Sequence, residues 1–197
     1  TARMLSALKK ERVEAKKVLK GPAAAGGATQ AEEMIACLHD ALYASNVCSY
    51  AQGMALIAVG SENYNWNIDL SETARIWKGG CIIRAELLEK IRAAFARRKD
   101  LPNLLVDSEF GAWIVSAQSN WRKAITFAQE LGIAIPALSA SLAYFDSYRS
   151  DVLPQNLTQA QRDFFGAHTY ERVDQPERGF VHTEWQELIK EKSATRS

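Results

Sequence analysis

The feature that most constrains the fold is a long apolar run over residues 29–60. Thr29 and Glu32 are spaced as a capping box at its start. Apolar side chains then recur every three or four positions, at Met34, Ile35, Leu38, Leu42, Val47, Tyr50, Ala51, Met54, Ile57 and Ala58. They cover more than one side of a helix, so a surface position would leave many of them in water. The run predicts a long helix at the centre of a helical bundle.

Further helices are predicted on both sides of this run, at residues 2–19, 72–78, 81–98, 109–131, 137–149 and 156–165. Asp69 or Ser71 is expected to cap the second of these, Gly132 to end the fourth, and Pro136 to lie in the first turn of the fifth. Strand periodicity of useful length and internal repeats are both absent from the sequence. The predicted class is therefore all-α, a helical bundle with a long central helix and an extended C-terminal tail.

Two parts are expected, a helical domain over residues 1–168 and a tail over residues 169–197. The tail carries Phe180, Val181 and Trp185, and large apolar residues in a tail indicate that it docks on something. Residues 186–197 are polar and predicted to be frayed. Because residue 2 already lies in a helical pattern without a preceding cap, we expect the chain to be a fragment of something longer.

Composition excludes several classes of partner. The 24 basic and 23 acidic side chains leave a net charge of +1, which provides no bulk field to attract nucleic acid or an anionic membrane. No run of about 18 apolar residues is present, so we expect no membrane span. Cys37, Cys48 and Cys81 lack C-x-x-C spacing, which is typical of reduced, mostly buried thiols in a cytoplasmic protein.

Catalytic and metal-binding motifs are also absent from the sequence. No G-x-G-x-x-G follows a strand, and neither a P-loop nor a nucleophile elbow is present. The histidines at positions 39, 168 and 182 do not match a zinc pattern. We therefore expect no metal site and no catalytic residue in this chain, and Arg84 is expected to form an internal salt bridge rather than to bind an anion.

The segment with the clearest chemical potential is the helix predicted after Pro154, with Asn156 or Thr158 as its cap and Gly166 as its end. In a continuous helix Arg162 and His168 would point apart by roughly 120°. A positive φ at Gly166 would release His168, so that both side chains could converge on one small anion. The alternative is that Arg162 is a solvated surface charge and His168 is incidental.

The segment QAQRDFFGAHTYE at residues 159–171 resembles the C-terminal signature of 6-phosphogluconate dehydrogenases. Phe164 is a mild departure, since the family more often has tyrosine there. Further segments that resemble this family follow in the same order along the chain: ARMLSALK at residues 2–9, SYAQG at 49–53, NYNW at 63–66, WKGGCIIR at 77–84, AYFDSYR at 143–149 and HTEW at 182–185.

The resemblance implies the C-terminal, all-helical part of an NADP-dependent enzyme of the pentose phosphate pathway and gluconate utilisation. That enzyme oxidises and decarboxylates 6-phosphogluconate to ribulose 5-phosphate. The resemblance places the NADP-binding domain and the acid–base pair upstream of Thr1, so this chain alone is expected to be inactive, and its own cofactor contacts are unknown.

Three substrate-binding residues are implied by the same resemblance: Arg3, Arg162 and His168. Arg3 and Arg162 would hold the sugar phosphate, and His168 would reach the substrate from the partner subunit's tail in a homodimer with exchanged tails. The remaining alternative is a catalytically inert dimerisation module with no ligand of its own.

Overall fold

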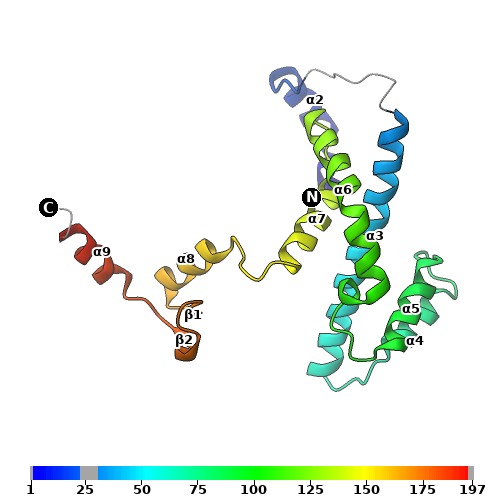
Figure 1. Ribbon diagram of the computed structural model, residues 1–197. Coiled ribbons are helices and arrows are strands. Elements are labelled where there is room, and N and C mark those ends of the chain that lie inside the picture. The colour runs from blue at the N-terminus through cyan, green and yellow to red at the C-terminus, as the bar shows by residue number, and fades with distance from the viewer. Residues whose placement is uncertain (1, 23–30, 195–197) are drawn as a thin grey trace. The chain divides into compact units, whose positions relative to one another are not determined.

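The computed structural model describes residues 2–22 and 31–194, and the side chains of residues 4–22 and 31–190 (Figure 1). The elements in chain order are α1 (Ala2–Ala7), α2 (Lys9–Val18), α3 (Ala31–Asn63), α4 (Leu70–Trp77), α5 (Leu87–Arg97), η2 (Leu104–Val106), α6 (Ser108–Glu130), α7 (Pro136–Tyr148), α8 (Asn156–Gly166), β1 (Tyr170–Glu171), η3 (Pro176–Arg178), β2 (Phe180–Val181) and α9 (Trp185–Ala194). The predicted all-α class is confirmed.

Contacts divide the chain into two compact units, Thr1–Tyr148 and Arg149–Ser197. This division groups α8 with the C-terminal segment, whereas the sequence led us to expect a boundary after residue 168. The reason lies in the side chains of α8, which bond to Thr169, just before β1, and to Trp185 in α9.

The first unit is built around α3, which spans about 50 Å at 1.5 Å per residue. Helix α3 packs along α6 and also contacts α7 and η2, and α4 packs on α5; Figure 1 shows α3 and α6 running side by side. Eight α3 residues are buried: Cys37, Ala41, Ala44, Ser45, Val47, Cys48, Ala51 and Met54. Of the apolar residues on which the central position was predicted, Ile35, Leu38 and Leu42 are exposed instead. The proposed capping residue Thr29 lies outside the described residues.

The ends of the bundle helices are set by specific local contacts. The carboxylate of Asp69 caps α4 by accepting from the amides of Ser71 and Glu72 at 2.8 and 3.1 Å. Gly132 ends α6 as predicted, with φ of 67°. A side chain there would also clash, because its Cβ would lie 2.9 Å from Cδ of Pro22.

Several predicted boundaries were wrong. The segment expected as one helix over residues 2–19 breaks at Leu8. The helix expected from residue 81 begins at Leu87, because residues 81–86 form turns after the positive φ at Gly80. The segment expected to fray after residue 186 is helical as far as Ala194. Two short strands, β1 and β2, pair antiparallel in the tail, where their two-residue length carried no period to detect.

None of the helices in the described part of the chain is long and apolar enough to cross a membrane.

Candidate functional site

Arg162 and His168 meet at the C-terminal end of α8. Arg162 lies within the helix, and His168 follows after the chain has turned away from the helix axis. Nη2 of Arg162 donates a hydrogen bond to Nε2 of His168. The predicted convergence of these two side chains is confirmed.

The residue expected to make the turn was wrong. Gly166 is the last residue of α8, and Ala167 takes the left-handed conformation instead, with φ of 49° and ψ of 43°. Thr169 is also left-handed, with φ of 66°. His168 therefore lies between two residues that are held in a conformation uncommon for residues other than glycine.

Gln159 joins the pair from one turn earlier on α8. Its Oε1 accepts from Nη1 of Arg162 at 3.2 Å, and its Nε2 lies 3.0 Å from Nδ1 of His168. The same Nε2 donates to the carbonyl oxygen of Thr169 at 2.6 Å. Gln159 was not predicted as a site residue, although its i, i+3 spacing from Arg162 places both on one face of the helix.

These three side chains form a cluster suited to a small anion. Arg162 and His168 are both exposed, so a ligand can approach them. A guanidinium keeps its charge and presents a planar fork of donors that matches phosphate or carboxylate oxygens. A histidine adds a further donor or a proton carrier.

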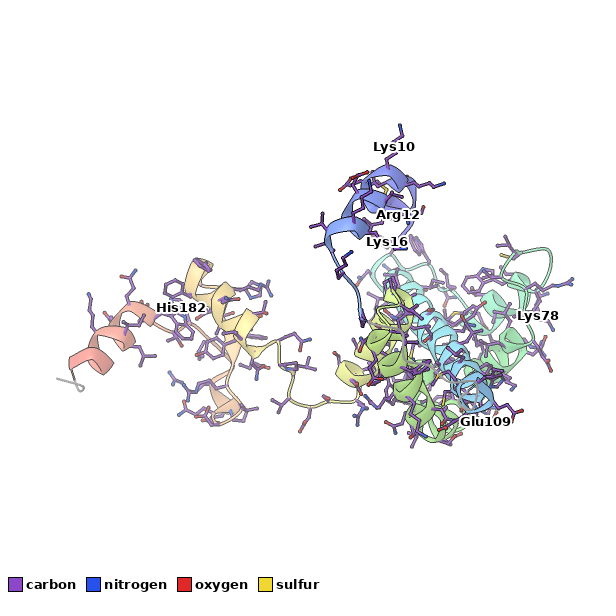
Figure 2. All side chains as sticks on the ribbon, turned by 90° about the horizontal axis from the view of Figure 1, so that it is seen from above. Lys10, Arg12, Lys16, Lys78, Glu109 and His182 are labelled. Carbon is purple, nitrogen blue, oxygen red and sulfur yellow. The ribbon has the colours of Figure 1, made fainter. Side chains whose placement is uncertain are left out.

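Asp163, the next residue along α8, is fully buried. Its Oδ1 accepts from the amide of Thr169 at 2.8 Å and from Nδ1 of His182 at 3.0 Å. Its Oδ2 accepts from the amide of Thr183 at 3.0 Å and from Nε1 of Trp185 at 2.8 Å. Figure 2 shows His182 in the segment that leads into α9. One carboxylate thus connects α8 to four later positions of the tail.

The surroundings of Asp163 and His182 shift the pKa values of both. Burial raises the pKa of the Asp163 carboxyl, but the donors from His182, Thr183, Trp185 and Thr169 together lower it more, so the net pKa lies well below 3.8. The hydrogen bond to Asp163 raises the pKa of His182 above 6.5, and Glu184, 3.8 Å from Nε2 of His182, acts in the same direction.

Arg3 and Arg84 are the other two arginines considered from the sequence. The backbone of Arg3 lies in α1, but its side chain is outside the described residues, so its substrate role stays a prediction. Arg84 is exposed and has no ion pair within the described part of the chain, so the expected salt bridge was wrong.

The C-terminal unit also contains a pocket of about 540 Å³, lined in part by Gln159, Tyr170, Arg172, Phe180 and Trp185. Arg162 and His168 are not among the residues that line it. Within the residues that the structure describes, histidine, cysteine and acidic side chains do not gather in groups of three or more that could hold a metal ion.

The pKa shifts predict how the stability of the C-terminal unit depends on pH. The lowered pKa of Asp163 contributes stability above pH 3.8 that is lost as the pH falls through its folded-state pKa. The raised pKa of His182 contributes stability below pH 6.5 that is lost as the pH rises through its folded-state pKa. The free energy of unfolding of this unit should therefore be highest between these two values.

Urea unfolding followed by the NMR signals of the Thr169 and Thr183 amides would measure this profile. The His182→Gln variant is the control, because it should abolish the alkaline decline and keep the acidic one. A wild-type stability that is unchanged from pH 5 to pH 9 would contradict the role assigned to the pair.

Comparisons with known proteins match the whole bundle and most of the tail. The family model described as "6-phosphogluconate dehydrogenase, C-terminal domain" matches residues 1–185. The decarboxylating 6-phosphogluconate dehydrogenase of Synechocystis sp. is 56% identical over 184 residues, which are 93% of this chain and 38% of that protein. The NADP(+)-dependent decarboxylating enzyme of Bacillus subtilis is 50% identical, over 93% of this chain and 39% of its own length.

A solved structure of Plasmodium falciparum 6-phosphogluconate dehydrogenase is similar in fold, with a TM-score of 0.84 and 41% identity, over 93% of this chain and 39% of that one. That enzyme is described in its apo form, with its cofactor NADP+ and with its substrate 6-phosphogluconate. The chain spans about two fifths of the length of these relatives. It belongs to the 6-phosphogluconate dehydrogenase family and corresponds to that family's C-terminal domain.

Proposed function

We propose that this chain is the substrate-anchoring and dimer-forming part of an NADP-dependent, decarboxylating 6-phosphogluconate dehydrogenase. The observation that carries the proposal is the convergence of Arg162 and His168 beyond the end of α8. An exposed guanidinium beside an exposed imidazole suits the phosphate of a sugar phosphate. The solved Plasmodium relative, with its substrate 6-phosphogluconate, supplies the identity of that sugar phosphate.

The contribution of this chain to the reaction is anchoring. Binding energy from a phosphate remote from the reacting carbons holds the sugar in one orientation, which lowers the entropic part of the barrier. Arg162 would bind the phosphate oxygens, with Arg3 on the same group, and His168 would contact the substrate.

The sequence lacks the glycine-rich strand–turn–helix unit that holds a dinucleotide. We propose that the part of the enzyme outside this chain binds NADP and carries the acid–base pair, and that this chain alone is inactive. A cytoplasmic location and a role in the pentose phosphate pathway belong to the same proposal.

The exposed side of α3 supports a homodimer. Ile35, Leu38 and Leu42 recur at three- and four-residue spacing, and Leu56 and Val59 follow farther along the same side of α3; all five are exposed. An apolar stripe of this length on a single helix favours cover by another surface, and a second copy offers the same stripe in an isologous interface. A dimerisation module without a ligand is the alternative function that this stripe would equally serve.

Substitution of Arg162 tests the anchoring role in the full-length enzyme. Arg162→Ala should weaken 6-phosphogluconate binding by about 1.5–3 kcal/mol, since it removes a hydrogen bond to a charged group. That corresponds to about tenfold to more than a hundredfold in affinity. The loss should shrink for an analogue without the phosphate, as measured by calorimetric titration. Equal losses for both ligands would contradict phosphate anchoring and would favour the inert module.

Substitution on the α3 stripe tests the dimer interface. Leu56→Lys should raise the dimer dissociation constant at least tenfold, about the effect of losing one energetically important contact, because it buries an unpaired charge. Sedimentation velocity of the 197-residue chain would measure it. Ile82→Lys is the matched control, since Ile82 is fully exposed and lies off the stripe. A wild-type chain that is monomeric at micromolar concentration would contradict the dimer.

Mixed dimers test whether the two subunits share a site. A full-length subunit carrying Arg162→Ala would be combined with one carrying Arg3→Ala. With shared sites, a heterodimer keeps one intact site, so part of the wild-type activity should return over the single variants. Activity that stays at the level of the single variants would mean that each site is built from one chain.

A further inference from the structure

His168 is held in place by a strained stretch of backbone. The residues on either side of it, Ala167 and Thr169, have φ values of 49° and 66°. A β-branched residue such as threonine is a rare occupant of this region. Such residues persist only where the surrounding structure holds them, and they concentrate at functional sites.

Side chains of α8 hydrogen-bond to both the amide and the carbonyl group of Thr169. The amide of Thr169 donates to Oδ1 of Asp163 at 2.8 Å, and its carbonyl oxygen accepts from Nε2 of Gln159 at 2.6 Å. Asp163 directly follows Arg162 in the same helical turn. One turn of α8 therefore carries the guanidinium and also anchors the residue that follows the imidazole.

The carboxylate of Asp163 is itself rigidly placed. It is fully buried and accepts from four donors, of which the other three come from His182, Thr183 and Trp185. Of the residues described in the C-terminal unit, it is the only one that is buried. A carboxylate held in this way has little freedom to follow Thr169 if that residue were to relax.

We propose that Asp163 is the positioning residue of the anion-binding pair, whose buried carboxylate keeps Thr169 left-handed and so holds His168 against Arg162. This inference rests on the proposed function, because the pair is taken to receive the phosphate of 6-phosphogluconate. Asp163 does not touch the substrate and acts only through the two residues that do.

Asp163→Asn is the direct test, because asparagine keeps the shape but replaces one acceptor oxygen with an NH₂ group that faces two donors. In the full-length enzyme we expect the KM for 6-phosphogluconate to rise at least about tenfold, since displacement of a binding group by about 1 Å can cost up to a hundredfold. The KM for NADP should not change. Asp174→Asn is the matched control, a loss of the same charge from an exposed ion pair with Arg172 in the same unit.

A double-mutant cycle shows whether Asp163 affects substrate binding by positioning His168 or independently of it. If Asp163 acts by holding His168, Asp163→Asn should raise the KM by less than about twofold once His168 is alanine. Additive losses would overturn the proposal. An unchanged KM in Asp163→Asn beside a raised KM in Arg162→Ala would overturn it as well, and would leave the proposed function intact.

The NMR spectrum of the 197-residue chain tests the geometry without activity. Asp163→Asn should shift the Thr169 amide signal and the His168 ring signals, and Asp174→Asn should leave both in place. If Arg162→Ala leaves the KM unchanged, the proposed function fails, and these signals alone decide whether Asp163 positions His168.

Trp185→Phe is a milder second variant, to be used if Asp163→Asn does not fold. It removes one of the four donors and keeps an aromatic ring, so the same signals should shift by less and the KM should rise in the same direction. If Trp185→Phe leaves the signals and the KM unchanged while Asp163→Asn unfolds the tail, Asp163 serves folding only and the proposal is wrong.

Discussion

The fold of the C-terminal unit depends on a buried carboxylate, whereas larger domains are held together by an apolar core. Asp163 is the one buried residue among those described there, and its four donors come from Thr169, His182, Thr183 and Trp185. A buried charge is costly unless every lone pair is satisfied, and a satisfied network rigidifies its surroundings. Small segments bury too little apolar surface to hold one conformation by packing. A polar network therefore holds this short tail in one shape.

The polar network around Asp163 bears on function, because the same turn of α8 carries both Asp163 and Arg162. The guanidinium points to solvent and the carboxylate points inward, where it holds the backbone next to His168. A site that binds a small anion needs its donors fixed within a fraction of an ångström. In this unit Asp163, which stabilises the fold of the tail, and Arg162, which is proposed to bind phosphate, are adjacent in the sequence.

The N-terminal unit is stabilised mainly by the packing of apolar side chains. Helix α3 buries small side chains such as Ala41, Ala44 and Ala51 against α6 and α7, which lets the helix axes approach closely. Asp107 caps α6 and also accepts from Nη2 of Arg97 at 2.9 Å, so one buried carboxylate ties the end of α5 to the start of α6. The apolar stripe left on α3 is the part of this pattern that the single chain does not cover.

The spacing of apolar residues and the positions of capping residues and glycines determined the all-α class, the long central helix, a cap at Asp69 or Ser71 and the end of α6 at Gly132, because these depend on residues close in the chain. The meeting of Arg162 and His168 was also predictable, since it required only a break between them. Only the tertiary structure decided that Ala167 and Thr169, rather than Gly166, take the left-handed conformation. The Asp163 carboxylate bonds to the Thr169 amide and to partners up to 22 positions away, and local sequence preference cannot report so distant a hydrogen bond.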